Sequence, residues 1–173
     1  MRTLGTAASP ERYARLTIKE RILREISRRL ETKDWTFATV QWEKIVRFPI
    51  PDDYRGLGAI LSVLDADEEF TVTTTGYQCA CEILLDYVLT PGAGETASSV
   101  LELVKGDLLE RLAGHHALRE GGDSGTGEEL SCTFLPVRYQ PMVPDNHEGP
   151  ARAMLTMNLV FRHETHRPFN RRP

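Results

Sequence analysis

Two acidic residues on one predicted strand are the first candidates for chemistry. Glu82 and Asp86 lie in the stretch Phe70–Thr90, whose apolar and polar side chains alternate from Tyr77 onward. Because successive side chains of a strand point to opposite faces, both carboxylates belong to the face opposite the apolar one. Two carboxylates on one face are a candidate general acid and general base. The better interpretation is a polar sheet surface that meets water, a partner subunit or a channel, because no suggestive Ser-His-Asp or Cys-His arrangement accompanies them.

A glycine-rich segment, Gly92–Ala97, is the second candidate. It matches the loose dinucleotide pattern G-x-G-x-x-A and lies between a predicted strand and a predicted helix. In that pattern the backbone approaches a pyrophosphate at a helix N-terminus. The motif functions within a βαβ unit, however, and no second βαβ half follows here. A tight turn between strand and helix also requires glycine. A small nucleotide-binding enzyme that uses Gly92–Ala97 is kept as an alternative function.

Cysteine and histidine are common zinc ligands, but their spacing here does not predict a metal site. Cys79 and Cys81 point to one face of the predicted strand and Cys132 lies on a later one, without a C-x-x-C pair or a fourth ligand. The run His163–His166 is not the helical H-E-x-x-H motif. Free cysteine is among the most buried residue types. The cysteines are therefore predicted to pack in the core, and no metal or other cofactor is expected.

Four acidic residues follow a short apolar run, Ala59–Leu64, that is typical of a buried strand. The acidic stretch contains the D-x-D spacing of a calcium loop but lacks the loop's glycine and distal glutamate. It is predicted to be a solvated or partner-facing turn before the next strand. Its carboxylates are Asp65, Asp67, Glu68 and Glu69.

Length and composition limit the classes of protein. A chain of 173 residues suits one domain with a real core. The net charge of −4 argues against a protein whose main task is to bind nucleic acid phosphates. No apolar run approaches the ~20 residues of a membrane span, and the N-terminus lacks the apolar core of a signal peptide. The odd number of cysteines indicates a reducing cytosol rather than a disulfide framework.

The order of predicted elements indicates an α+β fold. An N-terminal arm (1–16) precedes a single domain (17–166) and a basic C-terminal tail (167–173). Helix, strands, helix and strands in that order predict a mostly antiparallel sheet with two helices packed on one face. The expected elements are a helix from Thr17, an extended edge segment Trp35–Phe48, strands Ala59–Leu64 and Phe70–Thr90, a helix Thr96–Ala113, a flexible loop Glu120–Glu128, and strands Glu129–Tyr139 and Ala151–His163.

The first predicted helix begins at a capping box formed by Thr17 and Glu20. Its apolar residues recur at helical spacing, and basic residues occupy much of the remaining surface. The basic residues are expected to form a solvated face rather than a nucleic acid surface. The apolar stripe comprises Ile18, Ile22, Leu23, Ile26 and Leu30, and the basic residues are Lys19, Arg21, Arg24, Arg28 and Arg29.

Four stretches in this order carry a resemblance to a known family. They are IKERILREISRRLET at the first helix, AILSVLDADEEF before the long strand, ASSVLELVKGDLLERL at the second helix, and ARAMLTMNLVFRHETHRPFN at the end. Their layout resembles the tail terminator proteins of long-tailed bacteriophages, also called minor tail or tail-completion proteins. The similarity lies in layout rather than in a hard motif. A sister neck or tail connector component is therefore a second alternative.

The resemblance implies a structural protein with neither enzymatic activity nor a cofactor. Tail terminators form a ring, generally a hexamer, on the last ring of the tail tube, where they stop polymerisation and offer a surface for head attachment. The implied partners are further copies of the chain, the tail tube protein and a head-completion or neck protein, without a membrane. Viral DNA passes through the channel without sequence-specific binding. The implied location is the head-proximal end of the virion tail, assembled in the cytoplasm of a bacterial host.

The resemblance also assigns candidate roles to the charged residues. Glu82 and Asp86 are candidates for charges that line the ring lumen or pair with arginines of the adjacent subunit. An acidic lumen repels DNA phosphates and keeps the passing genome from adhering. The acidic turn, Asp65 to Glu69, is a candidate surface for the tube or the neck. The candidate contacts of the C-terminal tail with neighbours are Arg167, Arg171 and Arg172.

Overall fold

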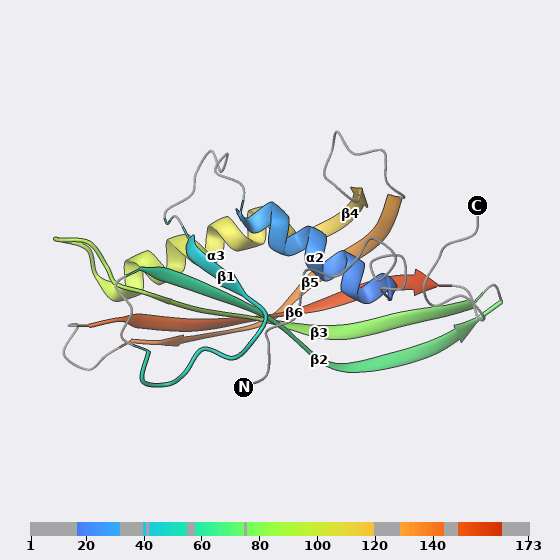
Figure 1. Ribbon diagram of the computed structural model, residues 1–173, viewed down its shortest axis with the longest axis horizontal. Helices are drawn as coiled ribbons and strands as arrows, with labels where there is room; N and C mark the ends of the chain where they lie inside the picture. The colour runs from blue at the N-terminus through green and yellow to red at the C-terminus, as the bar shows by residue number, and fades with distance from the viewer. Residues whose placement is uncertain are drawn as a thin grey trace, which may run out of the picture.

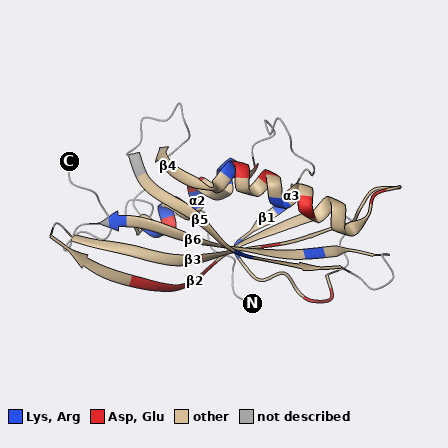
Figure 2. Cartoon of the chain, turned by 180° about the vertical axis from the view of Figure 1, so that it is seen from behind, with Lys and Arg blue, Asp and Glu red and all other residues tan. Residues whose placement is uncertain are grey.

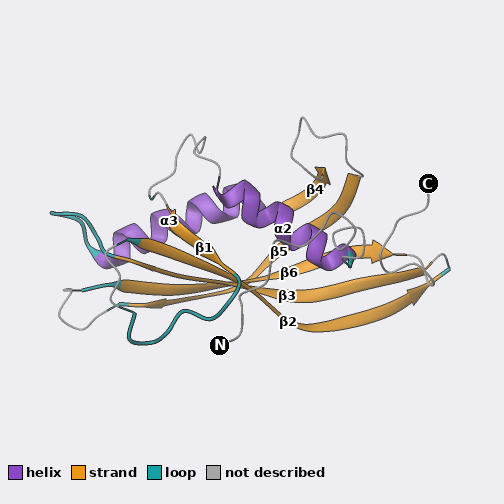
Figure 3. Cartoon of the chain, viewed as in Figure 1, coloured by secondary structure: helices purple, strands orange, loops and turns teal. Residues whose placement is uncertain are grey.

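The computed structural model describes residues 17–31, 40, 42–54, 58–74, 76–119, 129–143 and 149–163. The predicted arm 1–16, loop 120–128 and tail 167–173 lie outside these ranges. Two helices cover one face of a twisted sheet, which we term the helix-side face, and the opposite face is the back face (Figures 1 and 3). The helices are α2 (Ile18–Glu31) and α3 (Ala97–Leu112). Neither is long and apolar enough to cross a membrane.

The described strands form one sheet in the order β1-β2-β3-β6-β5-β4. β1 and β2 are parallel, and every other neighbouring pair is antiparallel. The predicted α+β fold, a mostly antiparallel sheet with two helices on one face, is therefore confirmed. The strands are β1 (Trp42–Val46), β2 (Ala59–Thr73), β3 (Gly76–Leu89), β4 (Gly114–Arg119), β5 (Glu129–Met142) and β6 (Ala151–His163).

Both helices begin at a threonine that caps the backbone. Thr17 Oγ1 accepts a hydrogen bond from the backbone N–H of Glu20 at 3.2 Å, and Thr96 Oγ1 accepts one from that of Ser99 at 3.2 Å. In α2 the predicted apolar stripe is buried against the sheet. The solvated basic face is wrong in part, because Arg21 is buried and Lys19 forms ion pairs with β2.

The core lies between the helices and the two central strands, β3 and β6. Every second side chain of β3 from Cys79 to Leu89 is buried on the helix-side face, as the alternation predicted. The Tyr87 hydroxyl donates to the carbonyl oxygen of Leu101 at 3.1 Å and so joins β3 to α3. The partners of these residues on β6 are Ala151, Ala153, Leu155, Met157, Leu159 and Phe161.

The single predicted strand Phe70–Thr90 is wrong at its start. β2 continues through Thr73, the chain reverses, and Thr73 pairs with Gly76 at the start of β3. The Thr73 hydroxyl donates to the carbonyl oxygen of Gly76 at 3.0 Å. This hairpin has no local sequence signal, because threonine favours strands and the turn lacks an Asn-Gly or Asp-Gly pair.

The second half of the sheet differs from the prediction at its edge. The strand β4, which follows α3 directly, was not predicted, and β5 continues to Met142, beyond the predicted end at Tyr139. The register of β5 against β6 shifts between Pro136 and Arg138. An edge position and a bulge are the places where a sheet accepts proline.

One end of the back face is covered by the segment that connects β1 to β2. Ile50 from this segment packs with Ile60 and Val88 in a second small cluster of buried residues. The Ser62 hydroxyl donates to the carbonyl oxygen of Phe48 at 2.6 Å. The segment therefore closes one end of the back face and leaves the other end open.

Candidate functional site

The Asp86 carboxylate is held on the back face by an arginine of the same chain. Arg152 Nε and Nη2 donate to Asp86 Oδ1 and Oδ2 at 2.9 and 2.7 Å. The same guanidinium donates to the carbonyl oxygen of Ile50 at 3.1 Å and to Asp52 Oδ1 at 2.9 Å. We term these four residues the Arg152 clasp. The clasp fastens the connection between β1 and β2 to the two central strands.

The environment of the clasp favours a structural role for Asp86. Asp86 is only 2 % exposed, and a buried carboxylate requires a paired charge and hydrogen bonds. The hydrogen bonds to Asp86 raise the pKa of Arg152 above its ordinary value, although burial of the guanidinium acts in the opposite direction. Arg152 therefore stays charged at neutral pH, and both side chains find their partners within one chain.

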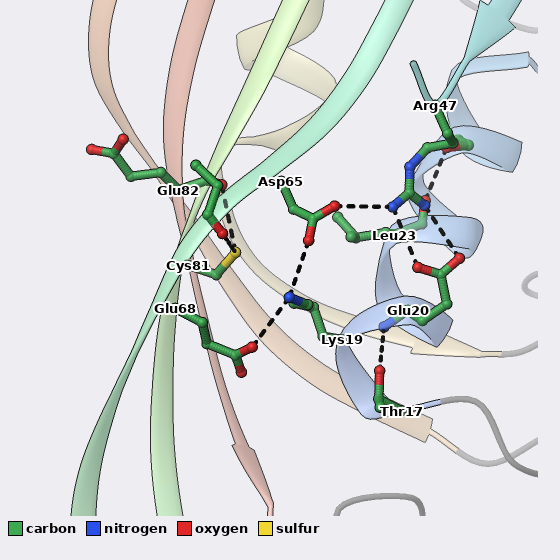
Figure 4. A network of polar contacts seen from close by, with 11 residues as sticks. Thr17, Lys19, Glu20, Leu23, Arg47, Asp65, Glu68, Cys81 and Glu82 are labelled. Carbon is green, nitrogen blue, oxygen red and sulfur yellow. Dashed lines mark hydrogen bonds and ion pairs between the residues drawn. The ribbon is translucent and has the colours of Figure 1, made fainter. Parts of the chain in front are cut away.

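Glu82 lies on the same face of β3 as Asp86 but has a different environment. Its side chain is exposed, and the Asn158 backbone lies opposite it in β6. In Figure 4 its carboxylate points to the side of β3 away from Lys19. Among the described residues no shared partner joins Glu82 to Asp86, so the two carboxylates are not arranged as an acid and base pair. The lumen or inter-subunit role stays a prediction, and Glu82 is the carboxylate free to perform it.

The predicted acidic turn is part of strand β2. β2 runs without interruption from Ala59 to Thr73, and its register against β3 shifts between Asp65 and Glu68. The predicted loop at these positions is therefore wrong, and Figure 2 shows the acidic stretch as part of the β2 ribbon. Asp and Glu are depleted in strands, which is why sequence reasoning assigned a turn. The bulge and nearby cations accommodate them in the strand.

The cations that accompany this acidic stretch come from α2 and from the residue after β1. Lys19 Nζ lies 3.0 Å from Asp65 Oδ2 and 3.1 Å from Glu68 Oε2. Arg47 Nη2 lies 3.3 Å from both Asp65 Oδ1 and Glu20 Oε2. Figure 4 shows these five residues, which we term the Lys19–Arg47 network, bridging the start of α2 to β2. The Glu20 side chain thus contacts Arg47 rather than completing the predicted capping box.

The pKa values in this network follow from its charges. Burial lowers the pKa of Lys19, but hydrogen bonds and charges from Asp65 and Glu68 outweigh burial and place it above its ordinary value. Burial raises the pKa of Asp65, but Lys19 and Arg47 outweigh burial and place it below its ordinary value. Both groups are therefore ionised across the neutral range.

The remaining two acidic residues of the stretch face outward. Asp67 and Glu69 are exposed, and within the described ranges neither forms an ion pair. Half of the predicted partner-facing carboxylates are thus engaged inside the chain, and half are available to a partner. The partner-facing role stays a prediction for Asp67 and Glu69.

The thiols pack in the core as predicted. Cys79, Cys81 and Cys132 are free and buried. Burial, followed by the negative charge of Glu68, raises the pKa of Cys79 to about 11, so that its thiol is protonated at neutral pH. The described residues contain no group of three or more His, Cys, Asp or Glu side chains that is placed to hold a metal.

The glycine-rich segment Gly92–Ala97 forms a turn that satisfies its own backbone. The Gly92 N–H donates to Glu95 Oε2 at 2.9 Å, and the Glu95 N–H donates to the carbonyl oxygen of Gly92 at 3.1 Å. A carboxylate of the segment itself therefore already accepts from a glycine N–H that a bound phosphate would require as a donor, and Thr96 caps the helix N-terminus. β3 is antiparallel to both of its neighbours, whereas the dinucleotide motif requires a parallel βαβ unit.

Sequence reasoning missed several residues of these sites. Arg152 could have been suspected because it lies on the polar face of β6, on the same side of the sheet as the polar face of β3. Only the pairing of β3 with β6 shows that Arg152 is diagonal to Asp86. Two exposed apolar groups were also missed, one on the β2–β3 hairpin and one on β5. They comprise Phe70 and Val72, and Leu135, Val137 and Met142. The predicted contact residues Arg167, Arg171 and Arg172 lie outside the described residues.

Comparisons with known proteins establish the fold alone. The sequence matches no family model, and no curated protein matches it. A chain in the solved structure "Virion of native gene transfer agent (GTA) particle" superposes with a TM-score of 0.54 at 12% identity, covering 84% of this chain and 98% of that one. A second solved structure has a TM-score of 0.42 at 11% identity, covering 90% and 98%. The chain therefore shares its fold with a component of a virion particle.

Proposed function

We propose that this chain is a structural virion protein and that it works as a tail terminator. In this role it caps the last ring of the tail tube, stops tube polymerisation and provides the surface to which the head or neck attaches. The observation that carries the proposal is the likeness to a chain of a virion particle, which spans 98% of that chain. The order of sequence features described above supports the more specific role.

The proposed protein acts through its surfaces rather than through an active site. We place copies of the chain in a ring, generally of six, between the tube protein and a head-completion or neck protein. Viral DNA passes through this ring without sequence-specific binding. The net charge of −4 and the exposed Glu82 support a lumen that repels phosphates. The proposed location is the head-proximal end of the tail, reached by assembly in the bacterial cytoplasm.

Deletion of the gene for this protein from the phage genome tests the terminator function. A missing terminator leaves the tube free to grow, so electron micrographs of lysates are expected to show overlong tubes without heads. Complementation with the wild-type gene is the control and restores uniform tails. Tails of normal length that lack heads would indicate a connector component of the neck instead. Normal particles without this protein would refute both roles.

Charge reversal at Glu82 tests the lumen assignment separately. Glu82→Lys places a cation where DNA would pass, so assembled particles are expected to inject or package DNA poorly. Glu110→Lys changes the charge equally on the exposed surface of α3, on the other side of the sheet, and serves as the matched control. Equal behaviour of the two variants would remove Glu82 from the lumen while leaving the terminator role intact.

A further inference from the structure

Two stretches of strand edge are left open by the described residues. β1 pairs with β2 only over Ala59–Ser62, which leaves the outer edge of β2 open from Val63 to Thr73. β4 pairs with β5 only over Glu129–Phe134, which leaves the outer edge of β5 open from Leu135 to Met142. The β2–β3 hairpin and the end of β5 lie at opposite ends of the molecule in Figure 1. Such edges are templates for pairing with another chain.

The open edge of β2 is acidic and rich in backbone donors. Asp67 and Glu69 are exposed on it, and Val72 beyond them is 75% exposed. The stretch Val63–Thr73 contains no proline, so each of its residues retains a backbone N–H. The edge therefore offers hydrogen-bond donors, negative charge and an apolar side chain.

The open edge of β5 has the complementary properties. Arg138 is exposed and forms no ion pair within the described part of the chain. Pro136 and Pro141 lack an N–H, and a proline in a sheet lies where its nitrogen faces an open edge. The edge therefore offers carbonyl acceptors but few donors. Leu135, at the start of the open stretch, and Val137 add exposed apolar surface.

These properties disfavour contact between two identical edges. Two β2 edges would bring like charges together, which destabilises a strand pair. Two β5 edges would place carbonyl acceptors against carbonyl acceptors, with few N–H groups to satisfy either. A β2 edge against a β5 edge brings Asp67 and Glu69 toward Arg138 and supplies donors to the carbonyls. The chemistry therefore selects an unlike pair of edges.

The geometry of the sheet agrees with this pairing. Glu69 is opposite Ala80 and Arg138 is opposite Thr156, and all four side chains stand on the back face. A sheet that continues from one copy into the next thus keeps Glu69 and Arg138 on the same side. Within one sheet β2 and β5 run in opposite directions, so copies that are related by rotation present them as an antiparallel pair.

We propose that the open β2 edge of one copy binds the open β5 edge of the next copy, head to tail. Such a heterologous contact closes into a ring when the rotation between neighbours permits it. Each open stretch is the C-terminal part of its strand, and because β2 and β5 run in opposite directions the two stretches lie at opposite ends of the sheet. Successive copies are therefore staggered, as strands are in a closed barrel. This contact rests on the proposed function, in which the protein works as a ring, and it assigns the surfaces that form the ring.

A charge exchange in the purified full chain tests the pairing. Glu69→Arg and Arg138→Glu are each expected to weaken self-association at least tenfold, as measured by sedimentation, because each places like charges at every junction. An equimolar mixture of the two variants is expected to associate as the wild type does, since every junction then pairs unlike charges in an alternating ring. Thermal unfolding of each variant confirms that the protomer is folded. A mixture no better than the single variants would overturn the proposal.

Cross-linking supplies a second readout that does not depend on charge. Val72→Cys and Val137→Cys place thiols on the two edges, while the native cysteines are buried. A short bismaleimide is expected to link the two variants when they are mixed, and neither variant alone. Links within Val72→Cys alone, or a wild-type protein that stays monomeric and unlinked at every accessible concentration, would refute head-to-tail contact. A ring that forms through these edges but leaves tail length unaffected would instead refute only the terminator function.

Discussion

The two ends of the sheet contain the same residue types on the same faces but surround them differently. On the helix-side face of β2, Val63 is fully buried and Val72 is 75% exposed. On the back face of β3, Asp86 is buried in the Arg152 clasp and Glu82 is exposed. We term the end with the clasp the closed end and the end with the β2–β3 hairpin the open end.

This contrast shows that the elements packed on the sheet, rather than the strands themselves, determine whether a side chain is buried or exposed. The closed end is covered by the connection between β1 and β2 on its back face. On its helix-side face it is covered by α3, whose Leu101 carbonyl oxygen accepts from the Tyr87 hydroxyl. The hairpin extends beyond α2 and α3 (Figure 1). Val63 and Asp86, which are covered, therefore contribute to stability, whereas Val72 and Glu82, which are exposed, are available for assembly.

Among the mutations that test this comparison, the largest loss of stability is expected at the Arg152 clasp. Asp86→Ala leaves Arg152 without its buried partner, and the free energy of unfolding is expected to fall by about 3 kcal/mol, the low end for a broken buried pair. The low end applies because Arg152 is partly exposed and keeps Asp52 as a partner. Glu82→Ala on the same strand is the matched control and is expected to change stability by less than about 0.5 kcal/mol.

Urea unfolding measures the loss of unfolding free energy in Asp86→Ala and in Glu82→Ala. Both variants place alanine in the same strand, so the effect of alanine's strand propensity cancels when they are compared. The double replacement Asp86→Leu with Arg152→Met is expected to be more stable than Asp86→Ala, because neither charge is then left unpaired. Equal losses in Asp86→Ala and Glu82→Ala would contradict the distinction between the two ends.

The next effect contrasts two valines on one strand. Val63→Ala is expected to lower the free energy of unfolding by about 2.5 kcal/mol, since it removes buried carbon atoms and leaves a cavity. Val72→Ala is expected to leave protomer stability within about 0.5 kcal/mol of the wild type. Denaturant titrations at matched concentration check both values. A loss at Val72 comparable to that at Val63 would show that the hairpin's helix-side face is buried in the free protein.

The core was largely predictable from sequence because its residues follow periodic rules. The 3.6-residue stripe of α2 and the alternation of β3 and β6 identified buried faces correctly. Thr17 was also correctly predicted to cap the first helix. The errors lie where two local rules compete. The acidic residues of β2 favour a turn, yet a bulge and cations from α2 and Arg47 keep them in a strand.

The candidate site was less predictable because it depends on long-range pairing. Sequence alternation placed Glu82 and Asp86 on one face, but it carried no information on which would meet Arg152, 66 positions after Asp86. The open edges were equally hidden, because β4 and the true end of β5 determine where each edge is exposed. Only strand order and register supply this information.

A smaller effect is expected in the Lys19–Arg47 network. Its side chains are partly exposed, so Lys19→Met is expected to lower the free energy of unfolding by about 1 kcal/mol or less. The loss is expected to shrink as salt concentration rises, because salt screens partly exposed charges. Lys44→Met, at an exposed position of β1, is the control and is expected to show neither the loss nor the salt dependence. A loss at Lys19 that is insensitive to salt would indicate packing rather than charge as its cause.

The smallest effect is the pH dependence of the same network, and its sign differs at the two extremes. The pKa of Asp65 lies below its ordinary 3.8 in the folded protein, so its contribution is complete above that pH and is lost as pH falls through the folded value. The pKa of Lys19 lies above 10.5, so its contribution is complete below that pH and is lost as pH rises through the folded value. The stability difference between wild type and Lys19→Met is therefore expected to form a plateau that declines on both sides. Unfolding free energies of both proteins measured across this pH range test the prediction. A stability difference that persists unchanged into strong acid would show that Lys19 does not stabilise the protein through Asp65.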